Sequence, residues 1–130
     1  MKWSLLDGLD LGGSGRIAAD DVDRQARTSR EILARFERQP GVVLADEVGM
    51  GKTFVALAVA SSVARATGKQ VVILVPPSVA EKWPREWTVF RDKCLGGRTD
   101  LRASETSVDN ATAFLRLLDD PPATRCHLVF

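Results

Sequence analysis

The feature that most constrains this 130-residue chain is an octapeptide in its first half, made up of Asp46, Glu47, Val48, Gly49, Met50, Gly51, Lys52 and Thr53. It follows an apolar run at 42–45, typical of a buried strand, and precedes a segment at 52–67 typical of a helix buried on a sheet. Glycines in such a turn direct backbone amides inward, and a helix N-terminus attracts anions. Lys52, the expected catalytic residue, adds a charge for the β- and γ-phosphates, and Thr53 adds a hydroxyl ligand for Mg²⁺. We therefore expect a phosphate-binding loop here.

The remaining apolar runs predict an α/β fold with a parallel sheet and flanking helices. Strands that are apolar throughout and alternate with helices are typical of sheets covered on both faces. Further strands are expected at 71–75 and from 127 onward. Helices are expected at about 21–38, at 52–67, from Ser78 onward and at 110–118. Asp20 or Asp21 would cap the first helix. Ser78 and Glu81 would form a capping box at the start of the third, which Pro84 should break or kink. Residues 1–19, rich in glycine, are expected to be a flexible segment.

Composition excludes several classes of protein. A formal net charge of +1 excludes a basic tail that binds nucleic acid by bulk electrostatics, so any such contact needs a local patch. Two cysteines are too few for a disulfide scaffold or a four-cysteine zinc site. The longest apolar run, 54–64, is shorter than the roughly 18 residues that span a bilayer. We expect a cytoplasmic protein without a membrane contact, whose oligomeric state the sequence leaves open.

Two motifs resemble those of a known family. Residues 44–53, Leu-Ala-Asp-Glu-Val-Gly-Met-Gly-Lys-Thr, closely resemble motif I of the Swi/Snf-type ATPases of helicase superfamily two, which also contains the DEAD/DEAH-box helicases. Residues 71–83, an apolar strand followed by Pro-Pro-Ser and a Trp-bearing helix, resemble motif Ia. The resemblance covers roughly 22–93. It implies a P-loop, RecA-like lobe that uses ATP and Mg²⁺ and acts on DNA or RNA.

The resemblance also implies roles outside the loop. Gln25 would read the adenine edge, since an amide donates and accepts together, although a solvated helix residue is an equal alternative. Ser78 and Lys82 would contact the nucleic-acid backbone, as a helix N-terminus attracts phosphate. The region 82–102 holds six basic and three acidic residues, an excess that suits such a contact or a solvated face.

The sequence lacks one expected motif. No Asp-Glu-x-His pattern follows residue 53, and 42–47, which imitates it, runs directly into the phosphate loop. We therefore expect 20–130 to be the first part of an incomplete lobe, truncated before motif II. Such a segment of a helicase- or translocase-type ATPase would bind nucleotide but hydrolyse it poorly alone, and its motor would need the missing C-terminal part. The alternatives are a nucleotide- or partner-binding module without turnover and another P-loop enzyme, such as a small-molecule kinase.

Overall fold

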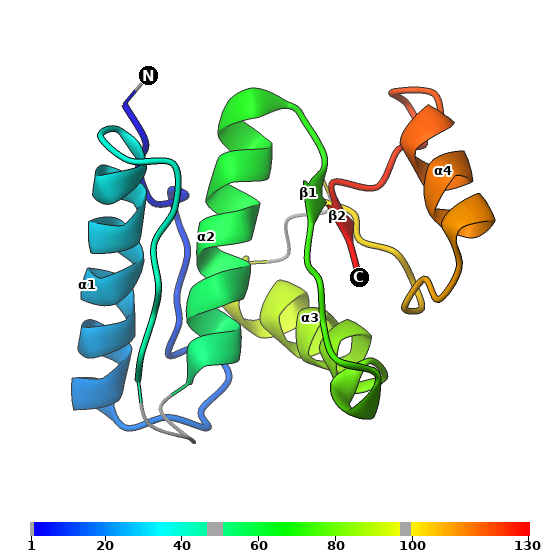
Figure 1. Ribbon diagram of the computed structural model, residues 1–130. Helices are drawn as coiled ribbons and strands as arrows, with labels where there is room; N and C mark the ends of the chain where they lie inside the picture. Colours follow the sequence, from blue (N-terminus) through cyan, green and yellow to red (C-terminus); the bar gives the residue numbers. More distant parts are fainter. Residues whose placement is uncertain (1, 47–50, 97–99) are drawn as a thin grey trace.

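The chain folds into helices around a very small parallel sheet (Figure 1). The structure is a computed structural model that describes residues 2–46, 51–96 and 100–130. Its elements, in chain order, are α1 (Ala19–Phe36), α2 (Lys52–Thr67), β1 (Val71–Val72), a 3-10 turn (Pro77–Val79), α3 (Lys82–Cys94), α4 (Ala111–Asp119) and β2 (Leu128–Val129). Within the described ranges, no helix combines the length and apolar character needed to cross a membrane.

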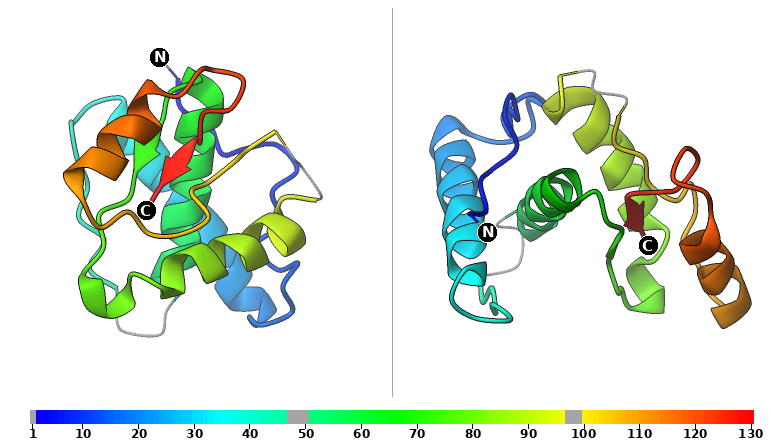
Figure 2. Two further views of the ribbon diagram at one scale, coloured as in Figure 1. Left: turned by 90° about the vertical axis from the view of Figure 1, so that its right-hand side faces the viewer. Right: turned by 90° about the horizontal axis from the view of Figure 1, so that it is seen from above.

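The sheet confirms the expected parallel pairing. Val71 lies opposite Leu128, and Val72 lies opposite Val129. The ladder continues past the assigned strands, because the amide of Ile73 donates to the carbonyl of Val129 at 2.9 Å. On its other edge β2 meets Ala103 through an isolated parallel bridge. Figure 2 shows β1 and β2 side by side with α4 beyond them.

Helix α2 is the centre of the fold. It begins at Lys52 and ends at Thr67, as predicted, and Gly68 closes it with a left-handed φ of 65°. Leu57 and Ala58 have no exposed surface, and Phe54 meets Phe90 of α3 edge-on with ring centroids 5.7 Å apart. Since α1 lies on one side and the strands on the other (Figure 2), apolar residues around most of the helix are removed from water.

Two expected strands need correction. Residues 42–45 are extended but form no strand, because no backbone in the described part of the chain pairs with them. Val43 is therefore 90% exposed. The strand expected at 71–75 shortens to Val71–Val72, and Leu74 beyond it is also 90% exposed. An apolar run indicates a buried strand only where neighbouring strands satisfy its amides and carbonyls.

The predicted helix starts also differ from the structure. Helix α1 follows Ala18, so neither Asp20 nor Asp21 caps it; both lie in its first turn. Ser78 lies in the 3-10 turn, and α3 follows Glu81, so the predicted capping box does not form. Pro84 is the third residue of α3 and does not interrupt it, because an amide in the first turn has no intrahelical acceptor to lose.

The N-terminal segment is irregular, as expected, but it is not a free tail. Leu11 is only 2% exposed and belongs to the core. The amide of Asp10 donates to the carbonyl of Cys94 at 2.8 Å, and the amide of Leu6 donates to Ser62 Oγ at 3.0 Å. Its leucines pack on α2 and α3, which corrects the expectation of flexibility drawn from glycine content alone.

Candidate nucleotide-binding site

The start of α2 has the geometry of an anion site. Gly51 precedes the helix with φ 76° and ψ 26°, a left-handed conformation that glycine adopts without a steric penalty. The amides of Phe54 and Val55 donate to the Gly51 carbonyl at 3.1 and 3.2 Å, so the hydrogen-bond ladder of the helix itself begins at Phe54. The predicted loop residues Glu47, Val48, Gly49 and Met50 lie outside the described residues.

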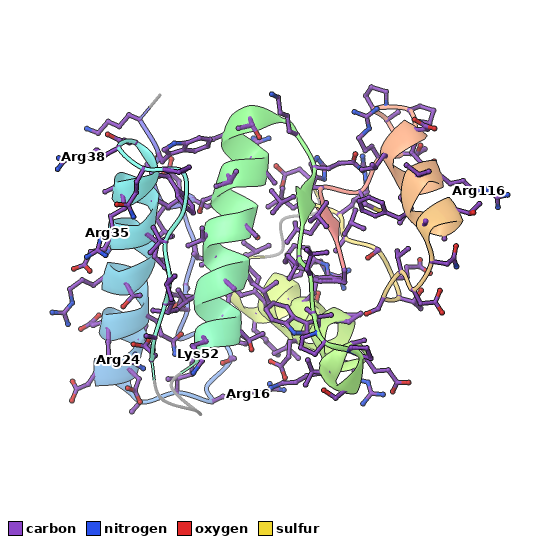
Figure 3. The ribbon with its side chains drawn as sticks, in the orientation of Figure 1. Arg16, Arg24, Arg35, Arg38, Lys52 and Arg116 are labelled. Carbon is purple, nitrogen blue, oxygen red and sulfur yellow. The ribbon has the colours of Figure 1, made fainter. Side chains whose placement is uncertain are left out.

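Both described ends of the loop are tied together. Lys52 Nζ donates to the carbonyl of Asp46 at 2.7 Å, which joins the start of α2 to the end of the extended segment. Arg24 of α1 forms ion pairs with Asp46 and with Asp21, both at 3.4 Å. Figure 3 shows Arg24 and Lys52 near the same end of α2. Asp46, where phosphate loops often have glycine or alanine, therefore has a structural partner on α1.

Gln25 of α1 lies against Gly51, the glycine that precedes α2. Its side chain is buried, with 1% exposure, and its Oε1 has no hydrogen-bond partner among the described residues. A Cβ at Gly51 would overlap Gln25 Nε2 and lie 2.8 Å from its Cδ, so this contact also requires glycine at position 51. The structure thus places Gln25 against Gly51, while its reading of adenine stays a prediction.

A hollow of about 380 Å³ opens at this end of α2. It is lined by Arg16 and Ile17 ahead of α1, by Gly51, Lys52, Thr53 and Phe54 at the start of α2, and by Lys82 and Glu86 of α3. The cations and the helix N-terminus suit a nucleotide's phosphates. The described residues contain no group of three or more carboxylate, histidine or cysteine side chains that could hold a metal ion.

The hollow brings together residues that sequence reasoning kept apart. Lys82, expected at a nucleic-acid contact, lies beside Lys52 and Thr53, whereas Ser78 is exposed and does not line the hollow. Arg16 and Glu86 were not predicted. Their contact joins positions 70 residues apart, and no local pattern in a sequence signals such a pairing.

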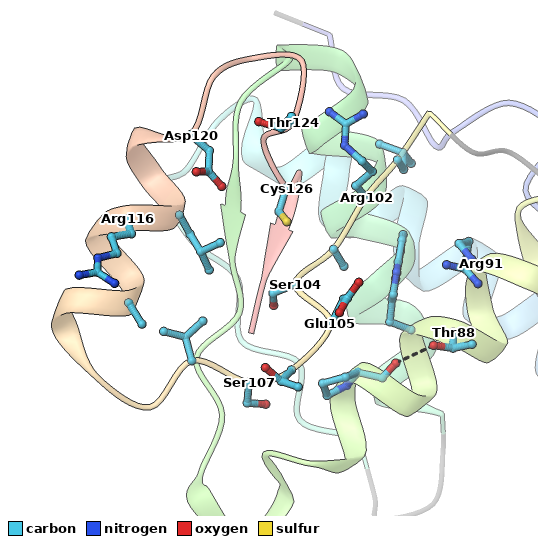
Figure 4. A pocket seen from close by; sticks show the side chains of 18 of the residues that line it. Thr88, Arg91, Arg102, Ser104, Glu105, Ser107, Arg116, Asp120, Thr124 and Cys126 are labelled. Atoms are coloured by element: carbon cyan, nitrogen blue, oxygen red, sulfur yellow. Dashed lines mark hydrogen bonds between the residues drawn. The ribbon is translucent and has the colours of Figure 1, made fainter.

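A larger hollow, of about 1190 Å³, lies elsewhere, between α3, the segment 101–109 and α4 (Figure 4). Its lining shares no residue with the hollow at α2. Cys126 lines it, and burial raises the pKa of that thiol, with Asp120 adding to the rise. A thiol with a raised pKa stays protonated at neutral pH and is a poor nucleophile. The Cys126 thiol is therefore not an activated nucleophile.

Comparisons with known proteins identify the family of this chain. Residues 20–115 match the family described as "Type III restriction enzyme, res subunit". RNA polymerase-associated protein RapA of Pseudomonas fluorescens (strain SBW25) is 36% identical over 74 residues, which are 56% of this chain. RapA of Stutzerimonas stutzeri is 35% identical over the same length. The matched part is 8% of each relative's length, and no solved structure matches.

The family match covers well over half of the chain, so its membership is established. The predicted resemblance to superfamily-two, Swi/Snf-type ATPases is confirmed, and the family implies a RecA-like fold of which the two-stranded parallel sheet is a small part. This chain belongs to the family of type III restriction enzyme res subunits, within the helicase-like ATPases of superfamily two.

Proposed function

We propose that this chain binds ATP with Mg²⁺ at the start of α2 and serves as the nucleotide-binding segment of a nucleic-acid-dependent helicase or translocase. The observation that carries the proposal is the hollow in which Lys52 and Thr53 lie at a helix N-terminus beside a left-handed Gly51. Lys52 would contact the β- and γ-phosphates, and Thr53 would bind Mg²⁺.

Hydrolysis needs more than this hollow supplies. Phosphoryl transfer to water requires a carboxylate for Mg²⁺ and a group that orients the attacking water. The described lining of the hollow has one carboxylate, Glu86, which faces Arg16 at 3.5 Å. We therefore propose that this chain alone binds nucleotide with little turnover, and that the carboxylates of an Asp-Glu-x-His motif complete the site in a whole motor.

The experiment that tests the proposal is calorimetric titration of the chain with Mg·ADP, for the wild type and for Lys52→Ala. Removing a charge-assisted contact to phosphate costs about 2–4 kcal/mol, so Lys52→Ala should lose most of the affinity. Lys69→Ala is the matched control, because Lys69 is exposed at the opposite end of α2 and should leave binding unchanged. Equal affinities for the wild type and Lys52→Ala would contradict the proposal.

The nucleic-acid contact remains part of the proposal. Ser78 and Lys82 are both exposed, and they flank the step from the 3-10 turn into α3. Backbone contacts by such residues carry little sequence preference. In a titration with duplex DNA at several salt concentrations, Lys82→Ala should lower the salt slope by about one. An unchanged slope would remove Lys82 from the contact.

A further inference from the structure

Arg16 is a cation at the mouth of the small hollow that neither the motifs nor the comparisons assign. It comes from the coil ahead of α1, and its Nη1 lies 3.5 Å from both carboxylate oxygens of Glu86 on α3. The Arg16 side chain is 54% exposed and that of Glu86 is 22% exposed. The pair therefore holds the guanidinium at the edge of the hollow, beside the residues that begin α2. Figure 3 shows Arg16 at the same end of α2 as Lys52.

Arg16 retains hydrogen-bonding capacity that its protein partner does not use. Its contact with Glu86 involves Nη1, and no described residue accepts from its Nε or Nη2. A guanidinium carries five N–H donors in a planar fork that matches phosphate oxygens. Arg24, the other arginine at this end of α2, differs because it faces two carboxylates, Asp21 and Asp46.

The charge balance of the hollow favours a polyanion. Among the described residues that line it, three cations, Arg16, Lys52 and Lys82, stand against one carboxylate, Glu86, an excess of two positive charges. The dipole of α2 adds partial positive charge at the same place. A di- or triphosphate chain balances that excess, whereas an adenine ring does not.

We propose that Arg16, oriented by Glu86, binds the phosphate chain of the nucleotide as a second cation beside Lys52. This assignment rests on the proposed nucleotide function of the α2 hollow. Arg16 would arrive from the N-terminal segment, which its contacts with the core hold in place. The segment ahead of α1 would then contribute directly to the nucleotide site.

Displacement of a fluorescent ADP analogue tests this assignment. Unlabelled Mg·ADP and Mg·pyrophosphate serve as the two competitors, because pyrophosphate has the phosphates without adenosine. Arg16→Ala should weaken both competitors about tenfold, the scale of a lost charge-assisted hydrogen bond at a partly exposed site. Arg85→Ala is the matched control, since Arg85 is an exposed arginine of α3 that pairs with Glu81 and does not line the hollow.

The variant Glu86→Gln tests whether the ion pair between Arg16 and Glu86 has only a structural role. This variant loses the ion pair but keeps the charge of Arg16, so binding should weaken less than in Arg16→Ala. Equal losses in the two variants would mean that the pair only supports the hollow, and would overturn the assignment.

The remaining outcomes also separate the possibilities. Loss of ADP affinity with unchanged pyrophosphate affinity would place Arg16 at the adenosine and overturn the phosphate contact. Wild-type affinity in Arg16→Ala would overturn the inference while leaving the proposed function intact. Failure of the wild-type chain to bind Mg·ADP would instead contradict the proposed function itself.

Discussion

Helices α2 and α4 carry similar apolar residues but are buried to very different degrees. In α2, eight of 16 residues are buried, and they lie on most sides of the helix. In α4, a strongly amphipathic helix of nine residues, none is buried, and Leu115 is 57% exposed. The right-hand view of Figure 2 shows α4 at the edge of the fold and α2 between α1 and the strands. Apolar residues thus surround most of α2 and form a stripe on α4, and the neighbours of each helix decide whether these residues join a core.

The candidate nucleotide-binding site lies at the start of α2, the more buried of the two helices. Lys52 and Thr53 extend from the first turn of a helix whose core residues, such as Val55 and Leu57, have no exposed surface. A binding site on a rigid helix holds its side chains more accurately than one on a loosely packed element. Helix α4 instead has apolar residues that are at most half-buried, and Gln70 Nε2 donates to its Leu117 carbonyl at 2.9 Å.

The largest expected effect comes from truncating one leucine in each helix, which compares the burial of α2 with that of α4. Leu57→Ala should lower the free energy of unfolding by about 2–5 kcal/mol, because it removes a fully buried side chain and leaves a cavity. Leu115→Ala should change it by less than about 0.5 kcal/mol, since that side chain is mostly exposed. Urea unfolding followed by circular dichroism measures both. Similar losses in the two variants would mean that α4 is packed as tightly as α2.

A smaller effect is expected at the loop glycine. Gly51→Ala should destabilise the fold by about 1–3 kcal/mol, because φ is 76° there and the new Cβ would overlap Gln25. Adding Gln25→Ala removes the overlap but not the backbone strain, so the double variant should recover part of the loss. Thermal unfolding of the single and double variants measures the coupling. Strictly additive losses would contradict the contact between Gln25 and Gly51.

Some elements could be predicted because their signals are local. Gly51 and Gly68 bracket α2, and the sequence placed both of its ends correctly. Asn110 caps α4 by accepting from the amide of Ala113 at 2.8 Å, a short-range contact that fits the predicted start. The parallel strand near the C-terminus followed from its apolar run and is confirmed by its pairing with β1.

Other features depend on distant residues and could not be predicted. Whether 42–45 becomes a strand depends on a neighbour that its own sequence does not contain. Ser78 has the residue type of a cap, yet packing starts α3 three residues after the 3-10 turn ends. In the site, the placement of Lys52 and Thr53 followed from the motif, but Arg16 and Glu86 meet only through the tertiary fold.

Hydrogen–deuterium exchange of the chain with and without Mg·ADP tests most directly whether nucleotide binds at the start of α2. The account predicts added protection in peptides that cover 46–56, because bound phosphates would accept from the first amides of α2 and the loop. Peptides that cover α4 should exchange at the same rate in both states. Unchanged exchange at 46–56 under saturating Mg·ADP, or protection confined to α4 and the larger hollow, would contradict the account.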